Sequence, residues 1–149
     1  MDARKTFSNT AAGLSFRYDD SWQPITDEDE DAVSLAHIQR PPYEDVRVLG
    51  PIPTEDGIQV GAEEYYSTLE SSLNLTRLSA KSLSIGALNA YRIKASATVE
   101  DQSLTILLVG VQMPTKPARN YFFYVGASSK TFEQNEAEYD AMAQSLKIS

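Results

Sequence analysis

The stretch "ALNAYRIKASATV", residues 87–99, has the most regular hydropathy pattern in the chain. From Tyr91 onward, small or apolar side chains alternate with charged or hydroxyl side chains, of which Arg92 and Lys94 come first. A period of two is typical of a β-strand, because successive side chains point to opposite faces of the sheet. The pattern predicts a strand with one wetter face and one buried face, the latter formed by Tyr91, Ile93, Ala95, Ala97 and Val99.

The chain that follows this strand predicts two more strands. "EDQS" (100–103) makes a tight connection to "LTILLVGVQM" (104–113), which is apolar almost throughout and is expected to be a central strand covered on both faces. "PTKPAR" (114–119) is a hairpin loop, and "NYFFYVGAS" (120–128) is again almost continuously apolar. Strands joined by such short, turn-rich links indicate an antiparallel meander.

The remaining segments predict further strands and two amphipathic helices. Strands are expected at 13–18, 32–39, 44–49 and 77–86, with a loop at 50–57. One helix is expected from Gly61 to Asn74, with Glu63 and Glu64 in its first turn and Asn74 as its stop. The other is expected from Thr131 to Leu146, opened by a capping box of Thr131 and Gln134. This order predicts an α+β fold, an antiparallel sheet with helices packed on it.

Length and composition limit the classes of protein. A chain of 149 residues predicts a single domain over 1–149, in which residues 1–12 can form a flexible N-terminal segment. The absence of cysteine excludes disulfides and thiolate metal sites, and His37 is the one histidine. A net charge of −8 and scattered basic residues argue against nucleic-acid binding. No apolar run is long enough for a transmembrane helix, so no membrane insertion is expected.

The compartment stays open at the level of the sequence. The N-terminus "MDARKTFSNTAAG" has no apolar core of a signal peptide. The protein is therefore expected either to be cytoplasmic or, if a leader was removed, to lie outside the cytoplasm in the cell envelope. The sequence does not give the oligomeric state.

Four segments resemble the PsbP-like superfamily, an α/β/α sandwich that includes PsbP, the envelope protein DcrB and a Ran-binding import factor. These segments, which span most of the chain, are "GLSFRYDDSWQPI" (13–25), "AEEYYSTLESSLN" (62–74), "IGALNAYRIKASA" (85–97) and "FEQNEAEYDAMAQSLKI" (132–148). The chain departs from the superfamily at Asp19 and Asp20, where a proline usually precedes the tryptophan step, and in the acidic run 27–31. The resemblance implies an accessory protein that binds other proteins without catalysis, often exported or lipid-anchored.

The acidic run "DEDED" (27–31) is the most conspicuous candidate for a cation site. Asp27, Asp29 and Asp31 match the first three ligand positions of a calcium-binding loop, but Ala32 and Ile38 stand where that loop needs its glycine and its closing glutamate. Three interpretations remain open: a solvated link between strands, a weak Ca²⁺ site, and a docking surface for a basic partner.

Other residues suggest binding rather than catalysis. Lys116 and Arg119 make a compact basic spot on the "PTKPAR" hairpin, either a partner-binding surface or an ordinary solvated tip. The aromatic run Tyr121–Tyr124 is either core or, if one sheet face is open, the floor of a binding site. No motif of a nucleophile, phosphate loop or metal site surrounds His37, so no catalytic residue and no cofactor are expected. The sequence predicts a non-enzymatic protein-binding accessory domain, with a small-ligand or Ca²⁺-binding domain as the alternative.

Overall fold

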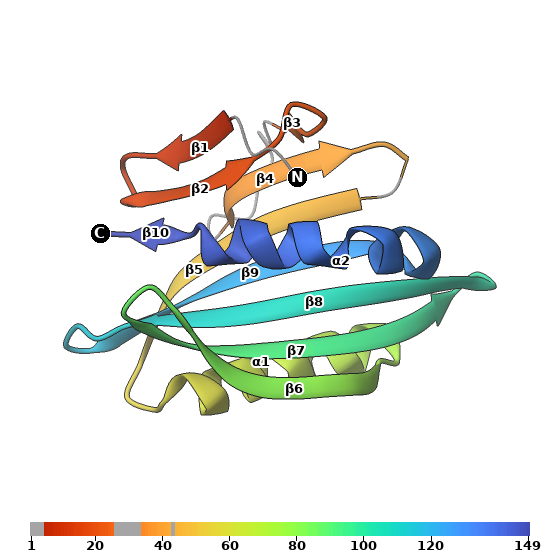
Figure 1. The fold of residues 1–149 in the computed structure, drawn as a ribbon. Helices are drawn as coiled ribbons and strands as arrows, with labels where there is room; N and C mark the ends of the chain where they lie inside the picture. The colour runs from red at the N-terminus through yellow and green to blue at the C-terminus, as the bar shows by residue number, and fades with distance from the viewer. Residues whose placement is uncertain (1–4, 26–33, 43) are drawn as a thin grey trace.

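The computed structural model describes residues 5–25, 34–42 and 44–149, which form ten strands and two helices (Figure 1). In chain order, these elements are β1 (Lys5–Asn9), β2 (Leu14–Tyr18), β3 (Gln23–Pro24), β4 (Ser34–Arg40), β5 (Glu44–Thr54), α1 (Ile58–Leu73), β6 (Thr76–Ile85), β7 (Leu88–Val99), β8 (Gln102–Met113), β9 (Ala118–Ser128), α2 (Ser129–Gln144) and β10 (Lys147–Ile148). In this part of the chain, neither helix is long and apolar enough to cross a bilayer.

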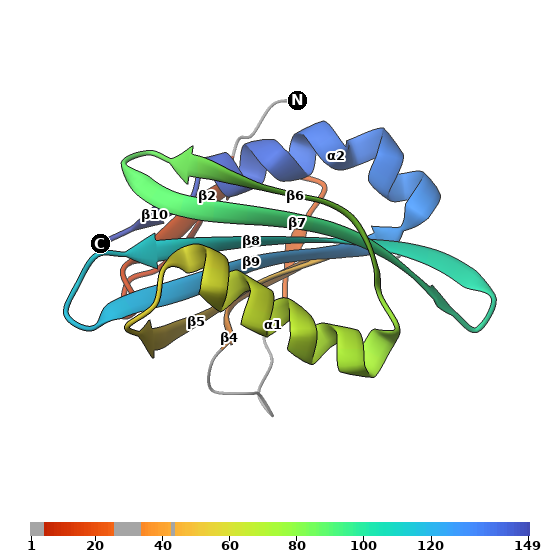
Figure 2. The same cartoon turned by 90° about the horizontal axis from the view of Figure 1, so that it is seen from below.

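The strands form two antiparallel sheets. The larger sheet has the order β3-β4-β5-β9-β8-β7-β6, and the smaller has the order β1-β2-β10. In Figure 1, α2 lies in front of the larger sheet and α1 lies behind it, and Figure 2 shows α1 from its own side. The predicted α+β class, with helices packed on an antiparallel sheet, and the predicted meander of residues 87–128 are both confirmed.

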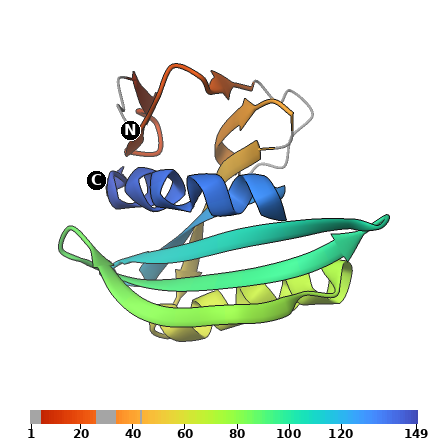
Figure 3. The same cartoon turned by 45° about the vertical axis from the view of Figure 1, so that its right-hand side comes forward.

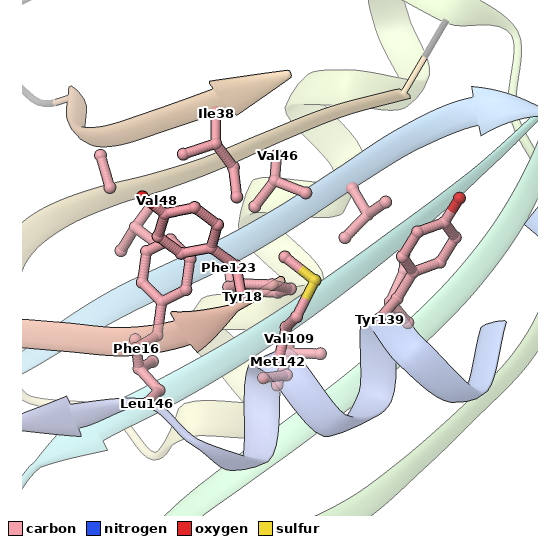
Figure 4. Close-up of a cluster of buried hydrophobic side chains, with 14 of the residues drawn as sticks. Phe16, Tyr18, Ile38, Val46, Val48, Val109, Phe123, Tyr139, Met142 and Leu146 are labelled. Atoms are coloured by element: carbon pink, nitrogen blue, oxygen red, sulfur yellow. The ribbon is translucent and has the colours of Figure 1, made fainter. Parts of the chain in front are cut away.

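One hydrophobic core fills the space between the larger sheet, α2 and the small sheet (Figure 4). Phe16 of β2 meets Phe123 of β9 edge to face, with ring centroids 5.9 Å apart. Trp22 is buried against Tyr139 of α2. The small sheet and α2 therefore cover the same face of the larger sheet.

A second core lies between the larger sheet and α1. The two cores share β8, because Leu107 and Val109 belong to the first and Ile106 and Leu108 to the second. The expectation that residues 104–113 form a central strand covered on both faces is therefore confirmed. Asn74 ends α1 in the left-handed conformation, as expected of asparagine at a helix stop.

The wetter face predicted for β7 is confirmed for most of its length, since Lys94 is half-buried and Thr98 is exposed, but α2 covers it at Arg92. Arg92 is buried, and its guanidinium donates from Nε to Asp140 Oδ1 (3.0 Å) and from an Nη to Glu136 Oε2 (2.7 Å). Lys94 also contacts Glu136, at 3.1 Å. The charged end of this face therefore makes an ionic contact with a helix distant in the sequence.

Both helices begin earlier than predicted. α1 starts at Ile58 after Gly57, so Glu63 and Glu64 do not lie in its first turn. The predicted capping box at Thr131 is wrong, because Ser128 is the N-cap and its hydroxyl accepts a hydrogen bond from the Thr131 backbone N–H. A serine one turn upstream competes for the same role.

β5 continues through the segment expected to be a loop. Its pairing with β9 shifts register between Leu49 and Ile52, and Gly50 has a φ of 131°, which favours glycine. β4 pairs with β5 only as far as Leu49. The prolines that follow therefore lie beyond the part of β5 that pairs with the described residues of β4, a position at which a missing N–H is tolerated.

β1 is a strand that the sequence pattern does not predict. Residues 1–12 are expected to form a flexible segment, whereas Lys5–Asn9 pairs along its whole length with β2, and Phe7 stacks on Phe16 with ring centroids 5.4 Å apart. The strand has no strong hydropathy pattern of its own, since most of its side chains are exposed.

Gly61 lies where α1 packs tightly on the sheet. A Cβ atom built on Gly61 would lie 2.2 Å from the side-chain nitrogen of Asn120. Asn120 is buried, and its Oδ1 accepts a hydrogen bond from Gln112 Nε2 at 3.0 Å. The glycine therefore allows the first turns of α1 to pack directly on β9.

Replacing Gly61 with alanine is expected to lower the free energy of unfolding by about 1–3 kcal/mol, because overpacking outweighs the better helix propensity of alanine. Chemical denaturation measures the change. Val60→Ala, at the neighbouring exposed position, is the control and is expected to be nearly neutral. A Gly61→Ala variant at least as stable as the parent would contradict this packing.

Candidate functional site

A half-open cavity of about 610 Å³ lies on the α1 side of the larger sheet, where the helix has ended. Its apolar floor comes from the last residue of α1 and from three sheet residues, namely Leu73, Ala97, Leu104 and Ile106. Its polar wall comes from the β4–β5 hairpin and β9, with Gln39, Arg40, Glu44, Asp45, Arg47 and Tyr124. α1 packs mainly on β7 and β8, so it leaves the β4 and β5 end of this face open.

Strand register places the polar wall. Arg47 of β5 stands opposite Tyr124 of β9, and Asp45 stands opposite Gly126. The Tyr124 ring lies along its strand, since a Cβ atom on Gly126 would be 2.9 Å from the tyrosine hydroxyl oxygen. Gly126 thus provides the space in which the tyrosine side chain sits beside the cavity.

Asp45 is the centre of a hydrogen-bonded group. Its Oδ1 lies 2.6 Å from His37 Nε2 and accepts from Gln39 Nε2 at 2.9 Å, and its Oδ2 accepts from Arg47 Nε at 3.0 Å. Burial opposes ionisation of this carboxyl, but the hydrogen bonds from Gln39, His37 and Arg47 outweigh it and lower the pKa of Asp45. The carboxylate is therefore charged at neutral pH.

Tyr124 supplies a neutral phenol to the cavity. Burial and the nearby charge of Asp45 raise the pKa of Tyr124 to about 12, since both disfavour the phenolate. At neutral pH its hydroxyl is protonated and can donate a hydrogen bond to a bound group. The wall therefore offers a phenol and a guanidinium as donors and a carboxylate as an acceptor.

The hairpin wall is anchored to α2 through Arg40. This guanidinium donates to Glu44 at 2.8 Å and to Glu138 of α2 at 2.8 Å, and it lies 4.4 Å from the centre of the Trp22 ring. Trp22 Nε1 also donates to Glu138, at 2.9 Å. Side-chain exposures of 15% for Arg40 and 4% for Glu44 make this a largely buried ion pair.

Glu44 is further held by Tyr139 and Asn135 of α2, both of which donate to its Oε2. Burial opposes its ionisation, but the hydrogen bonds from Arg40 and Tyr139 outweigh it and lower the pKa of Glu44. The same carboxylate makes deprotonation of Tyr139 harder, so burial and Glu44 together raise the pKa of that phenol.

The two basic residues singled out in the sequence do not line this cavity. Lys116 is exposed in the loop between β8 and β9, and Arg119 is a half-buried residue of β9 whose Nε donates to Thr115 at 3.3 Å. Both lie at the β8–β9 turn, and their partner-binding role stays a prediction. Asp27, Asp29 and Asp31 lie outside the described residues, as does any cation site that they form. Within the described ranges, no three His, Asp or Glu side chains are grouped to hold a metal ion.

The aromatic run is divided between core and cavity. Tyr121, Phe122 and Phe123 are buried, whereas Tyr124 is half-buried and reaches the cavity. A signal for the cavity wall is present in "EDVRVL", where Asp45 and Arg47 alternate with Val46 and Val48. The sequence predicts that segment only as a short strand, without a functional face.

No family model matches the sequence, and no curated protein matches it. Solved structures do match. CyanoP, the PsbP of Synechocystis sp. PCC 6803, is 12% identical with a TM-score of 0.71, over 100% of this chain and 94% of that one. LpqN of Mycobacterium tuberculosis, involved in cell envelope biogenesis, is 9% identical with a TM-score of 0.73, over 91% and 83%. The Ran-binding protein Mog1p of Saccharomyces cerevisiae is 7% identical with a TM-score of 0.58, over 99% and 96%. The chain therefore has the PsbP/Mog1-like fold.

Lowered carboxylate pKa values give the protein a defined acid sensitivity. A group whose pKa is lower in the folded state stabilises the fold above its unfolded pKa and loses this effect as pH falls through the folded value. For Glu44, the loss begins below about pH 4.5, its ordinary value.

Glu44→Gln is expected to lower the free energy of unfolding at neutral pH by about 1–3 kcal/mol, because the charged acceptor of Arg40 and Tyr139 is lost. It should also flatten the fall in stability below pH 4.5, as measured by denaturation across pH. Glu133→Gln, on the exposed side of α2, is the control and should leave both quantities unchanged. A parent-like pH slope in Glu44→Gln would show that this carboxylate is not responsible.

Proposed function

We propose that this protein is a non-enzymatic accessory domain that binds a segment of another protein in the cavity beside β4, β5 and β9. The observation that carries the proposal is the composition of the cavity, an apolar floor beside a wall of paired charges and a neutral phenol. Such a surface can bury an apolar side chain of a partner while its wall satisfies the partner's backbone polar groups.

The state of the acidic groups supports binding rather than catalysis. A general acid or base works best with a pKa near the operating pH, whereas Glu44 and Asp45 both have lowered pKa values and are held by hydrogen bonds. Tyr124 is shifted further from neutrality. These groups are suited to holding fixed charges and donors in place.

The comparisons favour the same class of function. Mog1p is a Ran-binding protein by its description, and LpqN is involved in cell envelope biogenesis. By analogy of fold, we infer a protein partner for this chain, and the likeness to LpqN favours a place in the cell envelope over the cytoplasm. The analogy does not identify the partner.

A small-ligand-binding domain is the second candidate, because a cavity of about 610 Å³ has the size of a small-molecule site. Native mass spectrometry of the protein from its own cells separates the two. If one small, non-peptide molecule stays bound to each protein chain, the small-ligand-binding function is favoured. If no such molecule is bound, the protein-binding function is favoured.

Photo-crosslinking in the native cells tests the proposed site. A benzoylphenylalanine placed at Leu104, on the cavity floor, is expected to form a covalent adduct with a discrete protein. The same group at Val60, exposed on α1 outside the cavity, is the control and should give none.

Gly126→Ala sharpens this test. The added Cβ would lie 2.9 Å from the Tyr124 hydroxyl and 3.3 Å from its ring, so the tyrosine must shift and the adduct should weaken by about tenfold or more. The melting temperature of the variant establishes that it folds. Equal adducts at Leu104 and Val60, or an adduct unaffected by Gly126→Ala, would contradict binding in the cavity.

A further inference from the structure

The two edges of the larger sheet differ greatly. One edge is β3, a strand of two residues that includes Pro24. The other is β6, a strand of ten residues without proline that, among the described residues, pairs with β7 alone. In Figures 1 and 3, β6 runs along the lower border of the sheet, with its outer side facing away from β7. Long unpaired edges are avoided in most proteins because they recruit other strands.

The register of the β6–β7 hairpin determines which residues of β6 have backbone N–H and C=O groups that point outward. Ile85 and Leu88 flank the two-residue turn Gly86-Ala87 and stand opposite each other in the register, so they form a hydrogen-bonded pair. Alternation then points the N–H and C=O groups of Ala80, Ser82 and Ser84 away from β7. One contact supports this assignment, because the Ser84 carbonyl accepts from Gln144 of α2 at 3.3 Å.

The side chains of β6 give the edge a charge. Its ten residues include Arg77 and Lys81 but no acid, in a chain of net charge −8. Arg77 is paired with Glu63, whereas Lys81 is exposed, stands opposite Arg92 and makes no ion pair with another described residue. Leu78 is 52% exposed beside them, one of the most exposed large apolar side chains in the described part.

We propose that β6 is a docking strand that pairs with an extended, acidic segment of another protein, which would add a strand to the larger sheet. The free N–H and C=O groups of Ala80 and Ser82 supply main-chain hydrogen bonds. Lys81 and Leu78 select a segment with a carboxylate and an apolar side chain at nearby positions.

A second copy of this chain fits the edge less well. Antiparallel pairing of β6 with itself would gather two Lys81 and two Arg77 side chains within a short stretch, where like charges destabilise pairing. Two chains of net charge −8 also repel each other at longer range. An acidic segment removes the first of these penalties.

This inference goes beyond the cavity and does not depend on it. The charged cavity wall lies on β4 and β5, toward the other end of the strand order. Either surface can therefore fail its test while the other passes.

The test uses a synthetic ten-residue peptide of alternating valine and glutamate, blocked at both ends, and follows backbone amide signals of the whole protein by NMR. Millimolar peptide is expected to shift the amides of Ala80, Ser82 and Ser84 before those of β4 and β5. The same peptide with lysine in place of glutamate should leave them unchanged.

Two variants at one position separate the backbone from the side chain. Ser82→Pro removes an outward N–H without breaking the ladder to β7, and it should weaken peptide binding about threefold to tenfold, the effect of one hydrogen bond. Ser82→Ala keeps the N–H and should bind as the parent does. Melting temperatures establish that both variants fold. If a variant does not fold, the amide chemical-shift changes in the parent protein still decide the test.

Three results would overturn the proposal. They are equal binding of the lysine peptide, amide shifts that do not include Ala80, Ser82 and Ser84, and a dimer in sedimentation that Ser82→Pro dissociates. The last result would assign the edge to a second copy of this chain.

Discussion

The hydrogen bonds of the Arg40 guanidinium join the β4–β5 hairpin to α2, two parts of the molecule that are far apart in sequence. Arg40 ends β4, Glu44 begins β5, and Glu138 lies 98 residues from Arg40 in α2. Burying such charges is costly unless each is paired. Pulling the hairpin away from α2 would leave charges unpaired while they are still largely buried, which is unfavourable. Trp22 completes the contact by covering the guanidinium and donating to Glu138.

This anchor on one face of the sheet determines what the other face can do. Side chains alternate along β5, so the Glu44 carboxylate, at the end of the cavity wall, is held by α2, while the Asp45 and Arg47 side chains lie on the opposite face of the strand. Holding Glu44 therefore also holds the cavity wall. On the same face of the sheet, but nearer its β6 edge, the ion pairs of Arg92 and Lys94 with Glu136 and Asp140 attach α2 to β7. α2 thus connects the cavity end of the sheet to the β6 end.

Much of the fold could be predicted from the sequence, because it rests on local periodicity. The alternation in residues 87–99 and the apolar run 104–113 predict their strands. β1 and the second half of β5 could not be predicted, since the first depends on its partner strand and the second on a break in register at Gly50.

The candidate site was harder to predict because it depends on contacts between segments that are distant in the sequence. Its wall and floor come from the β4–β5 hairpin, the end of α1, β7, β8 and β9, and Arg40 lies in no recognisable motif. The charges of Lys116 and Arg119 made them candidates, but they lie away from the cavity at the β8–β9 turn. The alternation in β7 predicts its wetter face, but not that Arg92 on that face is buried against α2.

The central claim, that Arg40 holds the cavity wall in place, is tested most directly by native-state hydrogen exchange of Arg40→Lys. Lysine keeps the charge but cannot bind two carboxylates through a planar fork. Faster exchange is expected for amides of the β4–β5 hairpin, at residues 36–40 and 44–48, with the β7–β8 amides unchanged. Arg47→Lys, a more exposed change on the same hairpin, serves as the control. Uniform acceleration across both regions, or no change in the hairpin, would contradict the claim.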